Sequence, residues 1–241
     1  MSHAGSCLFC AVDTTDLAFA QRLARQLIGA VGGLKLGLEF FVAHGPTGVR
    51  KVVGDSGLPL FLDLKFHDIP NTVAGAVRSA ASLGVQMMTI HAAGGPAMLA
   101  AAHTALEGLT NPPELLAVTV LTSMDSAQTA AIGLDRSPAS QVELLAKMGL
   151  AAGIRGFVCS PQEVATLRAL TGPEGVLVIP GIRPAGAGIG DQKRIATPAD
   201  ALRTGASYLV VGRPITQAPD PARAGEAILK EMAEALSHLG S

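Results

Sequence analysis

Two aspartates and a lysine stand close together in the segment FLDLKFHDIPNT, residues 61–72. Asp63 and Lys65 are two residues apart at the end of an apolar run, so on a β-strand their side chains point to the same face. Opposite charges about 4 Å apart gain on the order of 4 kcal/mol at an effective dielectric of about 20, which keeps the lysine protonated. A protonated lysine can deliver a proton to carbon, whereas a Schiff-base nucleophile must first lose its proton.

The second aspartate, Asp68, lies beyond the expected strand, in the turn before Pro70. This turn carries its carboxylate away from the face that Asp63 and Lys65 share. A purely structural group of ion pairs is the alternative interpretation, since charge networks also form where no chemistry takes place.

The elements that must position these charges are short apolar runs separated by longer segments of helical spacing. There are eight such runs, at 7–12, 33–38, 59–64, 86–92, 115–121, 156–160, 176–180 and 208–212, and helices are expected within 16–30, 71–84, 96–108, 141–153 and 222–236. Apolar runs that do not alternate are typical of parallel strands buried on both faces. The predicted fold is therefore α/β, a single-domain (β/α)8 TIM barrel over residues 1–241.

A doubly wound open sheet is the alternative fold. It is disfavoured by the eight regular units and by the lack of a glycine fingerprint after the first run.

The barrel interpretation places an active site at the carboxyl ends of the strands. Polar residues end or follow most of the apolar runs: Asp13, Lys35, Asp63 with Lys65, His91, Thr122 with Ser123, Pro180 to Arg183, and Gly212 with Arg213. Chains commonly turn polar where strands end, which is the simpler explanation for any one of them. Lysine and aspartate together at several ends favour a site. The glycine and arginine after the last strand fit either a phosphate site or a glycine turn with a solvated arginine.

The segment LDLKFHDIPNT resembles the D-x-K-x-x-D signature, followed by I-P-N-T, of the orotidine 5'-monophosphate decarboxylase family, bacterial type. Four further matches follow the order of the family: KLGLEF from residue 35, LTSM at 121–124, PGIRP at 180–184 with GDQKR at 190–194, and VGRPI at 211–215. The resemblance covers nearly the whole chain. It departs from the family in CAVD, where an aliphatic-Ala-Leu-Asp run is more frequent, and at Gly190, where a second aspartate is frequent.

The resemblance implies cofactor-free decarboxylation of orotidine 5'-monophosphate to uridine 5'-monophosphate, the last step of de novo UMP biosynthesis. Lys65 would stabilise and protonate the carbanion at carbon 6, while Asp63 crowds the departing carboxylate and holds Lys65. The resemblance also implies a homodimer in which Asp68 and Thr72 of one subunit complete the site of the other.

The substrate-binding residues follow from the same resemblance. The ribose would be held by Asp13 and Lys35, the pyrimidine read by Thr122 and Ser123, and the phosphate bound by Gly212 and Arg213, with Arg183 and Gln192 closing over it as part of a mobile lid and Pro180 lining the site. No metal or organic cofactor is implied, and His67 and His91 are assigned to packing or to support of the site.

Two other functions are compatible with parts of the sequence. D-x-K-x-x-D also occurs in metal-dependent sugar-phosphate lyases and decarboxylases of the same superfamily, although LTSM, PGIRP and GDQKR disfavour them. A non-catalytic barrel that binds a phosphate ligand is the third possibility, but a binder has no need of an ammonium between carboxylates.

Charge and hydropathy exclude several partners. The formal net charge is -1 and no Lys/Arg-rich run occurs, so neither nucleic acid nor an anionic membrane surface is an expected partner. Residues 79–106 carry no Asp, Glu, Lys or Arg, but Gly94-Gly95-Pro96 divides them into a strand and a helix rather than a membrane span. No secretion signal opens the chain, so the expected location is the cytoplasm.

The three cysteines are expected to be buried and unreactive. Cys7 and Cys10 have C-x-x-C spacing, but they lie inside an apolar run, where residues three apart point to opposite faces of a strand. Cys159 lies in a similar run, so no metal site or disulfide is predicted.

Overall fold

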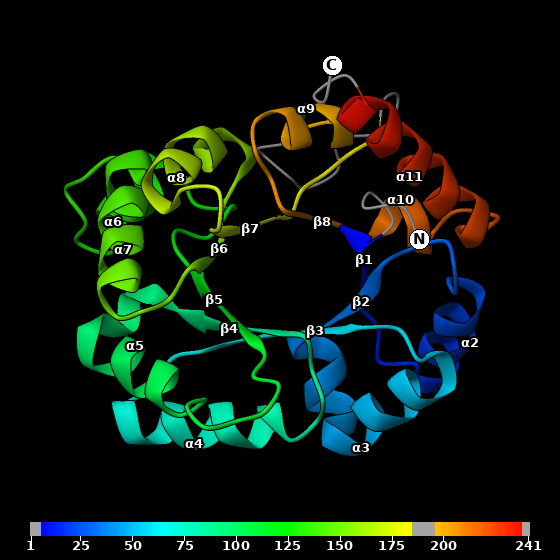
Figure 1. Cartoon of the computed structure of the whole chain (residues 1–241), viewed down its shortest axis with the longest axis horizontal. Helices are drawn as coiled ribbons and strands as arrows, with labels where there is room; N and C mark the ends of the chain where they lie inside the picture. The colour runs from blue at the N-terminus through cyan, green and yellow to red at the C-terminus, as the bar shows by residue number, and fades with distance from the viewer. Residues whose placement is uncertain (1–5, 185–195, 238–241) are drawn as a thin grey trace.

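The structure, a computed structural model, describes residues 6–184 and 196–237. Within these residues, eight parallel strands close into a barrel in chain order, with helices around the outside (Figure 1). The strands are β1 (Leu8–Val12), β2 (Gly33–Gly37), β3 (Leu60–Phe66), β4 (Met87–His91), β5 (Glu114–Val118), β6 (Gly156–Val158), β7 (Val176–Ile179) and β8 (Tyr208–Val211). Each lies within or overlaps a predicted run, so the (β/α)8 barrel is confirmed and the open sheet is wrong.

The helices of the described residues form the outer ring in Figure 1. They are α2 (Leu17–Gln26), α3 (Leu38–Ser56), α4 (Pro70–Ala81), α5 (Gly95–Thr104), α6 (Ser126–Ala131), α7 (Pro138–Ala151), α8 (Val164–Thr171), α9 (Pro198–Arg203), α10 (Arg213–Thr216) and α11 (Pro221–Ser237). The five predicted helices are present as α2, α4, α5, α7 and α11. The sequence patterns miss α3, because Gly45, at φ 56°, and Pro46 interrupt its helical backbone and spacing.

The barrel interior toward the amino ends of the strands is filled by side chains. Phe9 lies at its centre, with its ring edge-on to Phe61 at 6.3 Å and to Tyr208 at 5.6 Å between centroids. Gly33 leaves room for this ring, since a Cβ there would lie 2.3 Å from Cε1 of Phe9. These aromatic rings fill the barrel interior, and the cavity found among the described residues opens at the carboxyl ends of the strands.

The outer faces of the strands pack against the helices, and the three cysteines belong to the large core cluster formed there. Cys7, Cys10 and Cys159 are buried, as predicted. Burial raises the pKa of Cys10 to about 12 and raises that of Cys159 as well. Thiols with raised pKa values carry little thiolate at neutral pH and are poor nucleophiles.

The apolar segment 79–106 divides as predicted, into the end of α4, strand β4 and helix α5. Across residues 6–184 and 196–237, none of the helices combines the length and the apolar character that crossing a membrane requires.

Candidate active site

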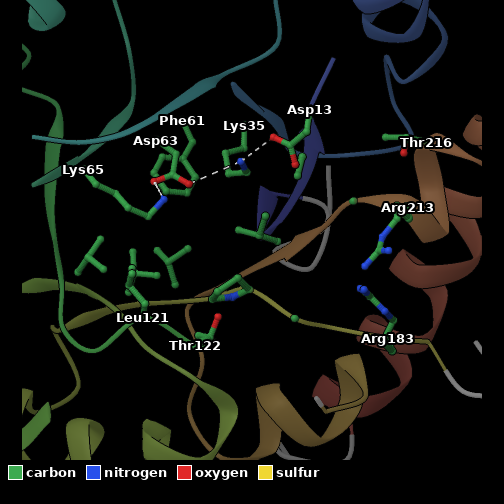
Figure 2. A pocket seen from close by; sticks show the side chains of 18 of the residues that line it. Asp13, Lys35, Phe61, Asp63, Lys65, Leu121, Thr122, Arg183, Arg213 and Thr216 are labelled. Carbon is green, nitrogen blue, oxygen red and sulfur yellow. Dashed lines mark hydrogen bonds and ion pairs between the residues drawn. The ribbon is translucent and has the colours of Figure 1, made fainter. Parts of the chain in front are cut away.

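A cavity of about 500 Å³ opens at the carboxyl ends of the strands (Figure 2). Its lining combines apolar side chains from inside the barrel with charged side chains at the strand ends. It includes nine of the residues predicted from the sequence: Asp13, Lys35, Asp63, Lys65, Thr122, Pro180, Arg183, Gly212 and Arg213. The alternation of side chains along strands brings these residues together, because the inward positions of eight parallel strands end at one mouth.

Four charged side chains form a continuous chain of ion pairs along one wall of the cavity (Figure 2). Lys65 Nζ lies 2.8 Å from Asp63 Oδ1, and Lys35 Nζ lies 3.6 Å from Asp63 Oδ2 and 3.2 Å from Asp13 Oδ1. The predicted proximity of Asp63 and Lys65 is confirmed. Positive and negative charges alternate, so each carboxylate has an ammonium neighbour and each ammonium a carboxylate.

Asp63 is the more deeply buried of the two carboxylates in this series of ion pairs, with 14% of its side chain exposed. Its burial favours the neutral form, but the charges of Lys35 and Lys65 and the hydrogen bonds from Lys65 and Thr89 outweigh burial and lower its pKa. Asp63 is therefore a carboxylate at neutral pH, and it is protonated only well on the acid side.

The backbone of Lys65 adopts an unusual conformation. Among the described residues, it is the one non-glycine residue with positive φ, at 49°. Such conformations cost roughly 1–3 kcal/mol and are typical of functional sites, where the surrounding structure holds them. The pairing of β3 with β4 also shifts register between Leu62 and Phe66, so Lys65 lies within an irregular stretch of strand.

Two arginines form a second charged region of the cavity, away from the ion-pair chain. Figure 2 shows the guanidinium groups of Arg183 and Arg213 directed toward each other. Arg183 is 8% exposed, and its pKa is lowered first by burial and then by the positive charge of Arg213. Two like charges that converge in a cavity provide a site for an anion such as phosphate.

Three predicted residues lie elsewhere. Ser123 is exposed and does not line the cavity, while Asp68 and Thr72 line a separate hollow on the far side of Lys65. The Asp68 carboxylate accepts a hydrogen bond from the backbone N–H of Ile69 at 2.6 Å. Within one chain, Asp68 is thus apart from the cavity, as the turn before Pro70 predicts. Gln192 and most of the expected lid lie outside the described residues.

The two histidines, His67 and His91, pack against each other near this hollow. The rings of His67 and His91 stack at 5.2 Å, and His91 Nδ1 accepts a hydrogen bond from the backbone N–H of Ala93 at 3.2 Å. No group of three or more His, Cys, Asp or Glu residues within 6–184 and 196–237 is arranged to hold a metal ion.

Sequence reasoning missed one buried polar residue beside the site, Thr89, which hydrogen-bonds both to Asp63 and to Lys65. A threonine inside the apolar run QMMTIHA was the available signal. It also missed Thr216 and Gln217, which line the cavity beside Arg213.

Fold and site together define a class of protein: a barrel whose cavity joins an ammonium–carboxylate chain to a cationic region suited to phosphate. The chain belongs to the orotidine 5'-phosphate decarboxylase / HUMPS family, which matches residues 6–228. The predicted family is confirmed.

Relatives and solved structures agree with this assignment. The chain is 52% identical over 231 residues to the orotidine 5'-phosphate decarboxylase of Paramagnetospirillum magneticum, covering 93% of this chain and 97% of the relative. It is 50% identical over 236 residues to that of Moorella thermoacetica, covering 95% and 93%. The crystal structure of orotidine 5'-phosphate decarboxylase from Lactobacillus acidophilus superposes with a TM-score of 0.80 at 37% identity, covering 94% of this chain and 98% of that one. Neither the metal-dependent lyase nor the non-catalytic barrel is supported.

Proposed function

We propose that the protein decarboxylates orotidine 5'-monophosphate to uridine 5'-monophosphate, the last step of de novo UMP biosynthesis, without a metal or organic cofactor. The single observation that carries this proposal is the arrangement of the cavity, with the Asp13-Lys35-Asp63-Lys65 chain along one wall and two converging guanidinium groups away from it. The names of the relatives support the same reaction.

The reaction breaks the bond between carbon 6 of the pyrimidine and its carboxylate. Carbon dioxide leaves and the electron pair stays on carbon 6. The Lys65 ammonium stabilises this developing charge and then transfers its proton to carbon 6, and Lys65 afterwards regains a proton from solvent. Asp63, 2.8 Å from Lys65 Nζ, holds the ammonium in place and lies where it crowds the departing carboxylate.

The rest of the substrate is held by the other predicted residues. Arg183 and Arg213 bind the 5'-phosphate together with Gly212, and Asp13 and Lys35 hold the ribose. Thr122 reads the pyrimidine, with Pro180 beside it, while Ser123 lies outside the cavity and has no assigned contact with the substrate. Gln192, outside the described residues, closes over the phosphate with Arg183.

The active form is a homodimer in the cytoplasm, with Asp68 and Thr72 of each subunit completing the site of its partner. Exposed apolar side chains that follow β2 and β3 support this assembly: Leu38, Val42 and Ile69 are 53%, 81% and 67% exposed. They follow β2 and β3, which are neighbouring strands, so they lie at the same end of the barrel as the cavity. Large apolar side chains exposed at the same end of a barrel as its cavity suit an interface between subunits.

Activity on orotidine 5'-monophosphate is expected to survive exhaustive chelation, because the carboxylates of the site are already paired with lysines. A spectrophotometric assay with and without EDTA measures this. The matched control is a Lys65→Ala enzyme, which should be severely impaired in both conditions. Activity that disappears with EDTA and returns with magnesium would indicate the metal-dependent lyase instead.

A further inference from the structure

Thr89 lies in the middle of β4 and is completely buried, with 0% of its surface exposed. Its hydroxyl donates a hydrogen bond to Asp63 Oδ1 at 2.9 Å and accepts one from the backbone N–H of Lys65 at 2.8 Å. One oxygen atom therefore contacts both residues to which the chemistry is assigned.

The irregular pairing of β3 and β4 explains why a side chain is needed here. Leu62 pairs with Met88 and Phe66 pairs with Ile90, so β3 advances four residues while β4 advances two. The intervening stretch of β3 lacks regular ladder partners on β4, and it contains both Asp63 and Lys65. The Thr89 hydroxyl accepts the Lys65 N–H bond that a regular ladder would have satisfied with a carbonyl.

We propose that Thr89 is a positioning residue for the decarboxylation, fixing the strained backbone of Lys65 and the carboxylate of Asp63 through one hydroxyl group. The inference rests on the function proposed above and adds a residue to it. Thr89 does not line the cavity, so it acts through Asp63 and Lys65 and not on the substrate.

The two hydrogen bonds require a short side chain that both donates and accepts at one atom. Serine preserves this group, whereas valine has nearly the same shape and lacks it. Without the hydroxyl, the backbone N–H of Lys65 loses its hydrogen-bond acceptor. The backbone of Lys65, at φ 49°, then loses one of the contacts that hold it in this conformation. The Lys65 ammonium and Asp63 then sample geometries in which proton delivery to carbon 6 is slower.

The hydroxyl also contributes to the charge state of Asp63. The charged groups that face this carboxylate are Lys35 from β2, Lys65 from β3 and, beyond Lys35, Asp13 from the end of β1, while His91 lies farther along β4. Removing the Thr89 donor takes away one hydrogen bond that favours the carboxylate, so its pKa rises. Activity that needs the carboxylate is then lost at a higher pH as the solution is acidified.

The test compares Thr89→Val, Thr89→Ser and wild-type enzyme in steady-state kinetics across pH. Thr89→Val is expected to lower kcat about 10-fold or more, with KM for orotidine 5'-monophosphate changed less than about threefold and the acid limb of the kcat profile moved to higher pH. Thr89→Ser should recover most of kcat and the wild-type acid limb. Thr119→Val is the matched control, because Thr119 is also a buried threonine, 1% exposed, and its hydroxyl donates to the Val158 carbonyl and not to Asp63.

Several outcomes would overturn the proposal: wild-type kinetics in Thr89→Val, equal losses in Thr89→Val and Thr89→Ser, or a loss matched by Thr119→Val with the acid limb unmoved. The first two outcomes would show that the hydroxyl has no specific role in the reaction. The third would show that it contributes only to the stability of the fold. If Thr89→Val does not fold, Thr89→Cys, a weak hydrogen-bonding group of similar size, replaces it in the same comparison. Failure of wild-type enzyme to decarboxylate the substrate would instead overturn the proposed function.

Discussion

Replacing Arg213 with alanine is expected to lower kcat/KM for orotidine 5'-monophosphate by about 100-fold or more, the scale of losing one or two charge-assisted contacts. Arg213 and Arg183 converge in the cavity away from the ion-pair chain, and a phosphate there balances two like charges. A phosphate group remote from carbon 6 still assists the chemical step, because its binding energy positions the pyrimidine against Lys65. Steady-state kinetics of the variant measure the loss.

Two controls separate phosphate binding from a general defect. Arg203→Ala removes an arginine that is half-exposed and paired with Asp200 at 3.0 Å, so its kinetics should match those of wild-type enzyme. The nucleoside orotidine lacks the phosphate, so wild-type and Arg213→Ala enzymes should process it at similar low rates. Near-normal kinetics of Arg213→Ala with the full substrate would show that the phosphate is held elsewhere.

The barrel was readable from the sequence because strands buried on both faces appear as continuous apolar runs. Helix α3 was not readable in the same way. Its sequence contains HGP at residues 44–46, and a glycine followed by proline predicts a break. In the structure, the backbone does break at Gly45, which has a positive φ, and a second helical stretch begins at Pro46. The glycine and proline therefore mark a real kink, and what they hide from the sequence is that helix lies on both sides of it.

The site was readable where chemistry depends on positions close in sequence. The pairing of Asp63 with Lys65 follows from their i, i+2 spacing, and the separation of Asp68 follows from the turn before Pro70. Contacts between strands were harder to foresee. The ion pair of Lys35 with Asp63 depends on the register of β2 with β3.

The role of Thr89 depends on a shift in the register of β3 with β4, and no local pattern marks where such a shift occurs. A threonine in an apolar strand is ordinarily a packing residue, since β-branched residues favour strands. Only the three-dimensional pairing shows that its hydroxyl lies between the two charged residues.

The Lys65→Ala and Asp68→Ala enzymes are each expected to lose about 1,000-fold or more in kcat, because removing one charge leaves its neighbours uncompensated in a site that the substrate closes to water. Lys65 lines the cavity, whereas Asp68 lies in the separate hollow beyond it, exposed within its own chain. If the dimer brings the Asp68 of one subunit into the site of the other, each active site takes its Lys65 and its Asp68 from different subunits.

Mixing the two inactive enzymes therefore separates the shared site from a site within one chain. In a mixed dimer, one site combines both defects, while the other takes Lys65 from the Asp68→Ala chain and Asp68 from the Lys65→Ala chain and is intact. Random exchange in an equal mixture makes about half of the dimers mixed, each with one of two sites intact, so about a quarter of wild-type activity is expected. Mass spectrometry of tagged chains verifies the exchange, and mixing Lys65→Ala with Asp63→Ala is the control, since both residues lie on one strand and cannot complement each other. If chains exchange and the first mixture stays as inactive as its parents, Asp68 acts within its own chain.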